Sequence, residues 1–187
     1  DFKFDNKKFV NPYKFIEDLS ELLNSKSIIY PDTGCNLGWC MQSFKVKFGQ
    51  RLISAWGNSP MGYSMAAGIG GKIHDPKKPV YSIIGDGSFM INLQELQFIM
   101  KNNINLKIII LDNRVYGNTY IGAKELFKNS SYGNDEKHGY FPPNIKNISQ
   151  CFNIKYFQLN NNLYDKKIIK NFIKSNKSSI LHVNIAP

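Results

Sequence analysis

Apolar residues recur at two spacings along the chain, and the two spacings alternate. After Asn11-Pro12, the residues Phe15, Leu19 and Leu22 follow one another at helical intervals. An asparagine cap with proline at the first helical position is typical of a helix start, so we expect a helix there. Short runs rich in β-branched and aromatic residues predict strands between the helical patterns. These runs lie at residues 27–30, 51–55, 80–84, 106–111, 154–159 and 179–185.

Two of the predicted strands are apolar without alternation. Ile83-Ile84 closes one of them, and residues 108–111 form most of the next. Such runs are typical of strands buried on both faces, because helices cover both sides of the sheet. Together with the intervening helices they predict an α/β fold with a doubly wound, mostly parallel sheet. Ligands of such sheets bind at the C-terminal ends of the strands, so the residues that follow the strands are the functional candidates.

The chain is expected to form a single domain. Its 187 residues suffice for one core, and no internal repeat or linker interrupts the pattern. One stretch, residues 122–143, has few aliphatic residues and several Gly, Asn and Ser. It is expected to be a long loop, which in compact domains is usually a functional lid or disordered.

The excess of positive charge raises the question of a nucleic-acid partner. The chain has 24 Lys and Arg against 14 Asp and Glu, a net charge of +10. The excess grows toward the C-terminus, where five lysines recur at near-helical spacing, as on the solvated face of an amphipathic helix. We prefer this interpretation to a phosphate-binding stripe and predict no nucleic-acid partner. The five are Lys166, Lys167, Lys170, Lys174 and Lys177.

The sequence also predicts a soluble, cytoplasmic protein. No apolar run approaches the ~20 residues that cross a bilayer, so no membrane partner is expected. The cysteines Cys35, Cys40 and Cys151 form no regular framework of disulfides or zinc ligands, which favours a reducing compartment. The histidines, His182 among them, are scattered in the sequence and are assigned no role.

Polar residues follow two neighbouring predicted strands. The tetrapeptide Gly-Asp-Gly-Ser at 85–88 comes after one strand, and Asp112-Asn113 after the next. Adjacent parallel strands would bring Asp86 and Asn113 close together. A carboxylate and an amide oxygen, beside a glycine that admits an anion, suit Mg²⁺ held against a diphosphate. For these residues taken alone, the alternative is a glycine turn with an asparagine that caps a loop.

The whole segment 85–113 resembles a known cofactor motif. Its Gly-Asp-Gly start and its close in Leu-Lys-Ile-Ile-Ile-Leu-Asp-Asn are similar to the thiamine diphosphate motif, which begins Gly-Asp-Gly and ends Asn-Asn. The segment looks most like the acetolactate synthase group, and this resemblance implies the thiamine diphosphate-binding fold. It further implies Asp86 and Asn113 as side-chain ligands of Mg²⁺, and Val115 as a ligand through its backbone carbonyl. The motif's penultimate asparagine is Asp112 here, which adds a negative charge near the site.

Two upstream segments match the same family in order. Residues 60–67 resemble the stretch in which a bulky apolar residue props the cofactor into its bent conformation. Met61 is the expected wedge, and the backbone carbonyl of Ser59 the expected partner of the cofactor's 4′-amino group. Residues 32–39 resemble the loop in which Gln-His often contacts the diphosphate; these positions are Cys35 and Asn36 here. Taken alone, Met61 is typical of a core methionine, and Cys35 as a nucleophile has no histidine in a predictable position.

The resemblance implies further cofactor contacts beside the strands. They are expected from Gly85, Gly87, Ser88, Tyr116 and Gly117. Family enzymes often select their substrate with the segment after the metal asparagine, here residues 116–122. The tryptophan that some acetolactate synthases carry in this segment has no counterpart, and Gly122 is its nearest match.

The resemblance also implies that residues 1–187 hold only part of an active site. In the family the cofactor lies between two domains, and the glutamate that activates it belongs to a pyrimidine-binding domain, which these residues lack. Glu95 is no substitute, because with Asn92 it forms a capping-box pattern that predicts a helix start. No catalytic residue is assigned within the chain. It is expected to work with a pyrimidine-binding domain or subunit in a homo- or hetero-oligomer.

The expected function is cleavage or formation of a C–C bond beside the carbonyl of a 2-oxo acid, dependent on thiamine diphosphate and Mg²⁺. The enzyme would be a lyase or transferase similar to acetolactate synthase. One alternative is the β subunit of a sulfopyruvate- or phosphonopyruvate-type decarboxylase, which the segment from Leu111 to Gly117 also resembles. Another is a non-catalytic basic binding module that kept the fold. A nicotinamide- or flavin-binding domain is disfavoured, because no Gly-x-Gly-x-x-Gly turn follows the first strand.

Overall fold

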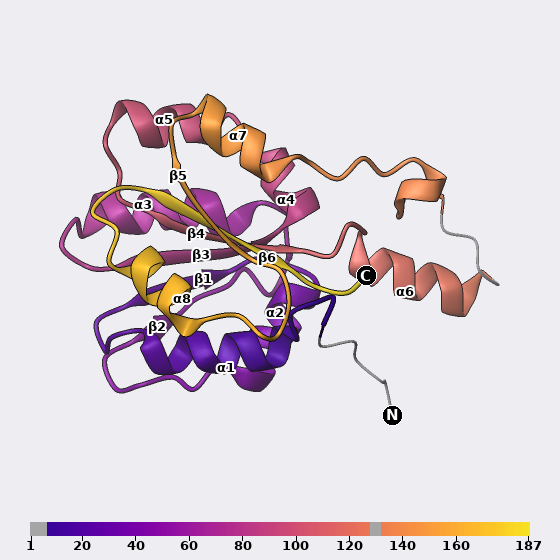
Figure 1. Ribbon diagram of the computed structural model, residues 1–187, viewed down its shortest axis with the longest axis horizontal. Helices are drawn as coiled ribbons and strands as arrows, with labels where there is room; N and C mark the ends of the chain where they lie inside the picture. Colours follow the sequence, from indigo (N-terminus) through magenta and orange to yellow (C-terminus); the bar gives the residue numbers. More distant parts are fainter. Residues whose placement is uncertain (1–6, 128–131) are drawn as a thin grey trace.

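The structure, a computed structural model, describes residues 7–127 and 132–187 (Figure 1). Its centre is a six-stranded parallel sheet with the order β2-β1-β3-β4-β6-β5. From β1 the chain places β2 on one side and β3 on the other, which creates a topological switch point of the kind where ligands bind. The predicted doubly wound α/β fold is confirmed. The strands are β1 (Ile28–Pro31), β2 (Arg51–Leu52), β3 (Val80–Gly85), β4 (Lys107–Asp112), β5 (Lys155–Leu159) and β6 (Ser179–Asn184).

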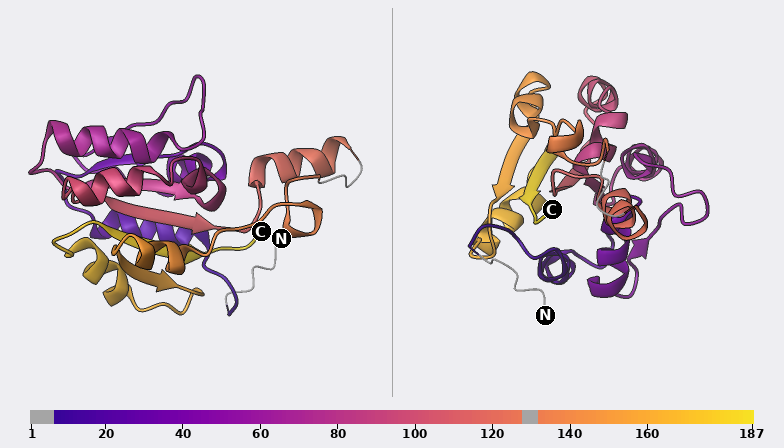
Figure 2. Two further views of the ribbon diagram at one scale, coloured as in Figure 1. Left: turned by 90° about the horizontal axis from the view of Figure 1, so that it is seen from above. Right: turned by 90° about the vertical axis from the view of Figure 1, so that its right-hand side faces the viewer.

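Helices cover both faces of the sheet (Figure 2). One buried cluster joins the sheet to α1, α2 and α8, and a second joins its other face to α3, α4, α5 and α7. The two clusters give the domain a three-layer arrangement. The helices are α1 (Pro12–Leu22), α2 (Cys35–Ser43), α3 (Tyr63–His74), α4 (Asp86–Ile91), α5 (Glu95–Lys101), α7 (Ile145–Cys151) and α8 (Lys166–Ile173).

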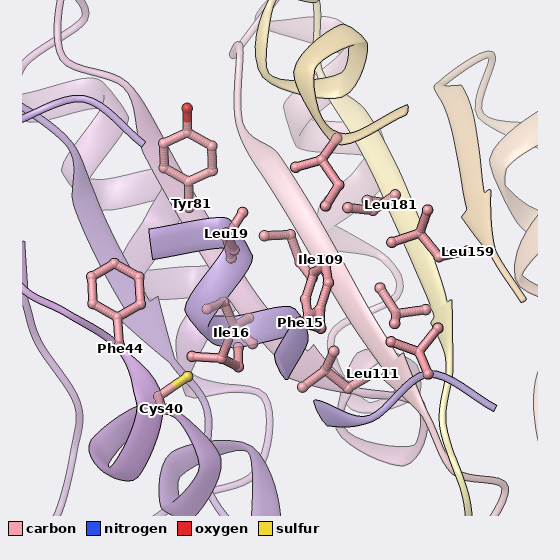
Figure 3. Close-up of a cluster of buried hydrophobic side chains, with 14 of the residues drawn as sticks. Phe15, Ile16, Leu19, Cys40, Phe44, Tyr81, Ile109, Leu111, Leu159 and Leu181 are labelled. Carbon is pink, nitrogen blue, oxygen red and sulfur yellow. The ribbon is translucent and has the colours of Figure 1, made fainter. Parts of the chain in front are cut away.

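The central strand β4 shows why its sequence lacks alternation. Ile109 and Leu111 pack in the cluster with α1, where Phe15 lies beside them (Figure 3). Ile108 and Ile110 pack in the cluster on the opposite face. Successive side chains of a strand point to opposite faces, so a strand covered on both sides needs an apolar residue at every position.

Most predicted elements are confirmed closely. Five of the six predicted strands begin and end within one residue of the observed bounds, and the Asn11 side chain caps α1 by accepting from the backbone N–H groups of Tyr13 and Lys14. The prediction for 51–55 is too long, because β2 has only two residues. The N–H of Ile53 still donates to the Ile29 carbonyl at 2.9 Å, after which the chain turns away from the sheet. As an edge strand, β2 has a single neighbour to hold it.

The connection after β3 differs from the prediction. Helix α4 begins at Asp86 directly, so residues 85–88 do not form the alternative glycine turn, and the capping box predicted from Asn92 and Glu95 is wrong. The Asn92 side chain donates to the Gly62 carbonyl at 2.8 Å, and Gln94 is the residue at the N-cap of α5. The following helix, α5, begins at Glu95 with Gln94 as an N-cap that makes no side-chain bond. A contact across 30 residues of sequence has therefore overridden the local signal.

The long loop predicted for 122–143 is also partly wrong. Helix α6 (Gly117–Leu126) occupies its first part, and a short 3-10 helix, η1 (Glu136–His138), lies in its second. Residues 128–131 lie outside the described part of the chain. Helix α6 projects from the body of the domain, and none of its residues is buried (Figure 1). A helix without a buried face has no apolar stripe, so its sequence carried no helical periodicity to detect.

The C-terminal lysines form a solvated face, as predicted. All five are exposed, while Ile169 and Phe172 of α8 are buried in the core. One of the five, Lys166, forms an ion pair with Asp18 of α1 at 2.7 Å. Among the described residues, no helix is long and apolar enough to cross a membrane.

Two glycines of α3 give a test of the packing between this helix and the sheet. A Cβ on Gly68 would lie 2.3 Å from Ser82 Oγ and 2.9 Å from a methyl carbon of Leu106, whereas Gly70 has no such neighbour within 4 Å. Gly68→Ala is expected to lower the free energy of unfolding by about 1–3 kcal/mol through overpacking. Gly70→Ala, the matched control, is expected to raise it by about 0.5–1 kcal/mol through helix propensity. Urea unfolding measures both; a shift of the same sign in the two variants would contradict this account of the packing.

Candidate functional site

A cavity of about 510 Å³ opens at the C-terminal edge of the sheet. Segments that follow β1, β3 and β4 form its walls, together with the turn before α3. The cavity thus lies at the switch point of the sheet, where the topology leads a ligand to be expected. Every residue predicted to bind the cofactor lines it: Cys35, Asn36, Ser59, Met61, Gly85, Asp86, Gly87, Ser88, Asn113, Val115, Tyr116 and Gly117.

Strand register brings the two predicted metal-binding side chains to one wall. Gly85 of β3 pairs with Leu111 of β4, so Asp86 and Asn113 each follow the end of a neighbouring strand. Both side chains are buried, with 2% of Asp86 and 8% of Asn113 exposed. Asn113 Oδ1 accepts from the Val115 N–H at 3.3 Å, which folds the chain back beside the site.

The surroundings of the Asp86 carboxylate disfavour its charged form. Burial, and then the charge of Asp112, raise its pKa, while a hydrogen bond from the Tyr140 hydroxyl to Oδ2 at 2.6 Å opposes the rise. Among the described residues, no group of three His, Cys, Asp or Glu side chains could hold a metal. A lone carboxylate with an amide and a carbonyl oxygen does not suit zinc, but it does suit Mg²⁺, which keeps water and phosphate oxygens in its shell.

Asp112, the departure from the family motif, turns away from the cavity into its own network. Its Oδ1 accepts from the Arg114 N–H at 3.1 Å, and its Oδ2 lies 2.9 Å from His182 Nε2. His182 Nδ1 in turn lies 2.7 Å from the Tyr156 hydroxyl. The network crosses β4, β6 and β5. Sequence analysis assigned His182 no role, although its strand neighbours β4 and places it within reach of Asp112.

Three glycines allow the walls of the cavity to approach one another. A Cβ on Gly87 would lie 2.4 Å from the ring of Tyr116. One on Gly117 would lie 2.9 Å from Cys35 Sγ, and one on Gly85 would lie 3.1 Å from Asn36 Nδ2. Any side chain at Gly87 or Gly117 would therefore displace a neighbour that lines the cavity, which is why the strand ends meet there through glycine.

The wall after β1 presents amide and thiol groups. Cys35 and Asn36 begin α2, behind Gly34 with a φ of 76°. Asn36 Nδ2 donates to the Thr33 carbonyl at 3.3 Å, and Cys35 Sγ lies 3.0 Å from Asn118 Oδ1. Burial raises the pKa of the Cys35 thiol, so it stays protonated at neutral pH and is a poor nucleophile.

Asp32 builds the turn that carries Met61. Its buried carboxylate accepts from the Gly62 N–H at 3.1 Å and from the Ser64 N–H at 3.0 Å. Ser59, with a φ of 46°, shares a hydrogen bond between its hydroxyl and that of Thr33. The Met61 side chain lines the cavity and is 37% exposed, so the alternative of a core methionine is wrong. Sequence analysis missed Asp32, although it lies in a quoted motif.

Of the segment that follows Asn113, only the first residues line the cavity. Asn118 and Thr119 of α6 line the cavity, and the Thr119 hydroxyl donates to Asn134 Oδ1 at 2.8 Å. Gly122 lies farther along α6, outside the cavity lining, and a Cβ there would meet open space. Asn118 and Thr119 belong to the segment expected to select the substrate but were not predicted as cofactor contacts, and Asn134 was not predicted as a site residue.

Comparisons with known proteins agree with this geometry. Residues 32–183 match the family described as "Thiamine pyrophosphate enzyme, C-terminal TPP binding domain". A "Probable acetolactate synthase large subunit" of Methanocaldococcus jannaschii is 32% identical over 98% of this chain and 32% of that protein. The acetolactate synthase large subunit of Lactococcus lactis is 27% identical over 81% of this chain and 26% of that protein.

A plant relative extends the comparison. The chloroplastic acetolactate synthase 1 of Zea mays is 29% identical over 82% of this chain and 24% of that protein. The chain thus spans between 24% and 32% of the length of these relatives. It belongs to the thiamine pyrophosphate enzyme family, as a C-terminal TPP-binding domain of the acetolactate synthase-like group.

Proposed function

We propose that this chain holds the diphosphate and Mg²⁺ ends of thiamine diphosphate in an enzyme that decarboxylates or carboligates 2-oxo acids. One observation carries the proposal: the residues quoted for the cofactor come from four separate segments, and all of them line one cavity. The family match supports the cofactor class. The names of the relatives support the reaction class, because each is an acetolactate synthase.

The chemistry of the lining residues fits the cofactor. Asp86, Asn113 and the Val115 carbonyl offer hard oxygen ligands of the kind that Mg²⁺ prefers. Cys35, Asn36 and the residues around Gly87 would face the diphosphate, where Asn36 can donate through its amide. Met61 and the Ser59 carbonyl would hold the thiazolium and pyrimidine rings. The glycines leave the room that a bound diphosphate requires.

According to this proposal, the chain binds and orients the cofactor, and it supplies no group that transfers a proton. When bound, thiamine diphosphate provides the thiazolium that accepts the electron pair released from a 2-oxo acid. A glutamate on a pyrimidine-binding domain, in a longer form of this protein or in another subunit, would activate it. An oligomer in which two such domains meet would complete the site. A cytoplasmic location stays a prediction from the cysteine pattern.

The cavity favours acetolactate synthase-like chemistry over the alternatives. A substrate with a sulfonate or phosphonate tail would call for Lys or Arg, and the described residues that line the cavity include neither. Asp86 is the charged side chain among them. A binding module that had lost catalysis would have no need to keep both oxygen ligands, and the lysines of α8, Lys166, Lys167 and Lys170, are exposed to solvent outside the cavity lining.

Metal removal tests the proposal. Calorimetry of the chain with thiamine diphosphate is expected to show saturable binding with Mg²⁺ and at least about tenfold weaker binding with EDTA, because Asp86 and Asn113 would hold the metal and the metal would offset the charge of the diphosphate. At 100 times the dissociation constant, Mg²⁺ and cofactor together are expected to add about 2.7 kcal/mol to the free energy of unfolding.

Thiamine, which lacks the diphosphate, is the control ligand and is expected to bind without dependence on Mg²⁺. Equal affinity for thiamine diphosphate with Mg²⁺ and with EDTA, or no binding in either, would rule out the proposed site.

A further inference from the structure

Tyr140 lies behind the cavity and touches the carboxylate proposed to bind Mg²⁺. Its hydroxyl donates to Asp86 Oδ2 at 2.6 Å, across 54 residues of sequence. Tyr140 is 6% exposed and lies outside the cavity lining, so it would contact neither cofactor nor substrate directly. It belongs to no part of the cofactor motif, since it lies in the stretch after α6.

The Tyr140 ring is held on two sides. Its backbone N–H donates to the Asp135 carbonyl at 2.9 Å, and Val115 forms a bridge with Asp135. The ring packs on that of Tyr116, with centroids 4.6 Å apart and the planes inclined by 55°. Tyr116 in turn packs against Gly87, where a Cβ would lie 2.4 Å from its ring. The hydroxyl is therefore fixed in place before any ligand arrives.

This hydroxyl determines how Asp86 can present its oxygens. A carboxylate has two oxygens that accept hydrogen bonds or bind cations, and Tyr140 holds Oδ2. The plane of the group is thereby set, and backbone N–H groups at Asp86 and Gly87 add further uncharged stabilisation. A neutral donor orients the carboxylate without cancelling its charge. Among the described residues, Asp86 has no Lys or Arg within ion-pair distance.

A second buried tyrosine–aspartate pair elsewhere in the protein differs in how the charge of the aspartate is compensated. The Tyr164 hydroxyl donates to Asp18 Oδ2, also at 2.6 Å, and Asp18 is 4% exposed. Asp18, however, also pairs with Lys166 at 2.7 Å and with Lys14 at 3.5 Å. There the protein neutralises the buried charge itself, as a structural contact requires. At Asp86 the charge remains for a cation from outside.

We propose that Tyr140 is a positioning residue for the metal ligand Asp86: it orients the carboxylate for Mg²⁺ while leaving its charge available. This inference rests on the proposed function, because it presumes that Mg²⁺ binds at Asp86. Hydrogen-bonding partners of metal ligands typically contribute 10–100-fold to metal affinity. The effect of Tyr140 is accordingly one on metal affinity, and it would not require a change in the folded structure.

The experiment compares Tyr140→Phe with Tyr164→Phe in the full chain. Each variant removes one buried hydroxyl from an aspartate and keeps the ring. Mn²⁺, which replaces Mg²⁺ and is visible by electron paramagnetic resonance, is titrated into each protein with saturating thiamine diphosphate, and Mg²⁺ is then used to displace it. Tyr140→Phe is expected to weaken Mn²⁺ binding by about tenfold. Tyr164→Phe is expected to leave it unchanged, and melting without ligand is measured in both variants.

The outcomes separate the two proposals. If the unaltered chain binds Mn²⁺ with thiamine diphosphate and Tyr140→Phe binds it equally well, Tyr140 does not position Asp86, and the proposed function stands. If both variants lose affinity equally, the loss reflects general loosening and the positioning role is also overturned. If the unaltered chain binds no Mn²⁺, both the proposed function and the role of Tyr140 are wrong.

Discussion

Asp86→Asn is expected to weaken the Mg²⁺-dependent binding of thiamine diphosphate by at least about 100-fold, since a direct ligand should matter more than its hydrogen-bonding partners. The substitution keeps the shape of the side chain and removes the one carboxylate among the described residues that line the cavity. Asp112 cannot take its place, because its oxygens are held by Arg114 and His182. Calorimetry with and without Mg²⁺ measures the loss.

Asp18→Asn is the matched control for this variant. Asp18 is similarly buried and also accepts a hydrogen bond from a tyrosine hydroxyl. It belongs to α1, pairs with Lys166 of α8 and lies outside the cavity lining. Its substitution is expected to leave cofactor affinity unchanged. Asp86→Asn without ligand is expected to melt no lower than the unaltered chain, because it removes a buried charge that forms no ion pair with a Lys or Arg in the described part of the chain. Binding of cofactor by Asp86→Asn with undiminished Mg²⁺ dependence would exclude Asp86 as the ligand.

Asp32→Ala is expected to lower the free energy of unfolding by about 3 kcal/mol, because two buried backbone N–H groups lose their acceptor. These are the N–H groups of Gly62 and Ser64 at the start of α3. The carboxylate is fully buried, so water cannot readily replace it. Urea unfolding measures the effect. The turn that carries Met61 is expected to loosen as well, so cofactor affinity should fall together with stability.

Asp75→Ala is the control for Asp32→Ala. Asp32 binds the N-terminal end of α3, and Asp75 lies at the C-terminal end of the same helix. It accepts from the Lys77 N–H at 3.1 Å near solvent and pairs with Lys78 at 3.6 Å. Since water can satisfy the exposed donor, its loss is expected to cost less than about 1 kcal/mol. Equal destabilisation by the two variants would show that Asp32 is not the anchor of this turn.

The fold was predictable from the sequence where a strand is buried on both of its faces. Strands β3 and β4 are covered on both faces, so their unbroken apolar runs identified them and their bounds. The prediction failed for β2, which ends when its single neighbour no longer holds it. It failed again at α6, where the absence of a buried face removed the periodicity on which helix prediction depends.

The site was predictable to the extent that its residues follow strands. The residues quoted from the motifs all line the cavity, most of them because they directly follow β1, β3 or β4, and Ser59 and Met61 because they lie in the turn before α3. Asp32, Tyr140 and His182 were missed as supports of the site. Each acts through a contact with a segment 30 or more residues away in the sequence. Such contacts depend on tertiary packing, which one sequence does not reveal.

Under the proposed function, helix α6 would separate the requirements of folding from those of substrate selection. None of its residues is buried, so substitutions along it should cost little folding free energy. Yet Asn118 and Thr119 of the same helix form part of the cavity wall. Under the proposed function, a lineage could therefore exchange this wall residue by residue while the sheet and the predicted metal ligands stay intact. The domain would in this sense be evolvable: new substrate preferences could arise by gradual drift of one solvent-exposed helix.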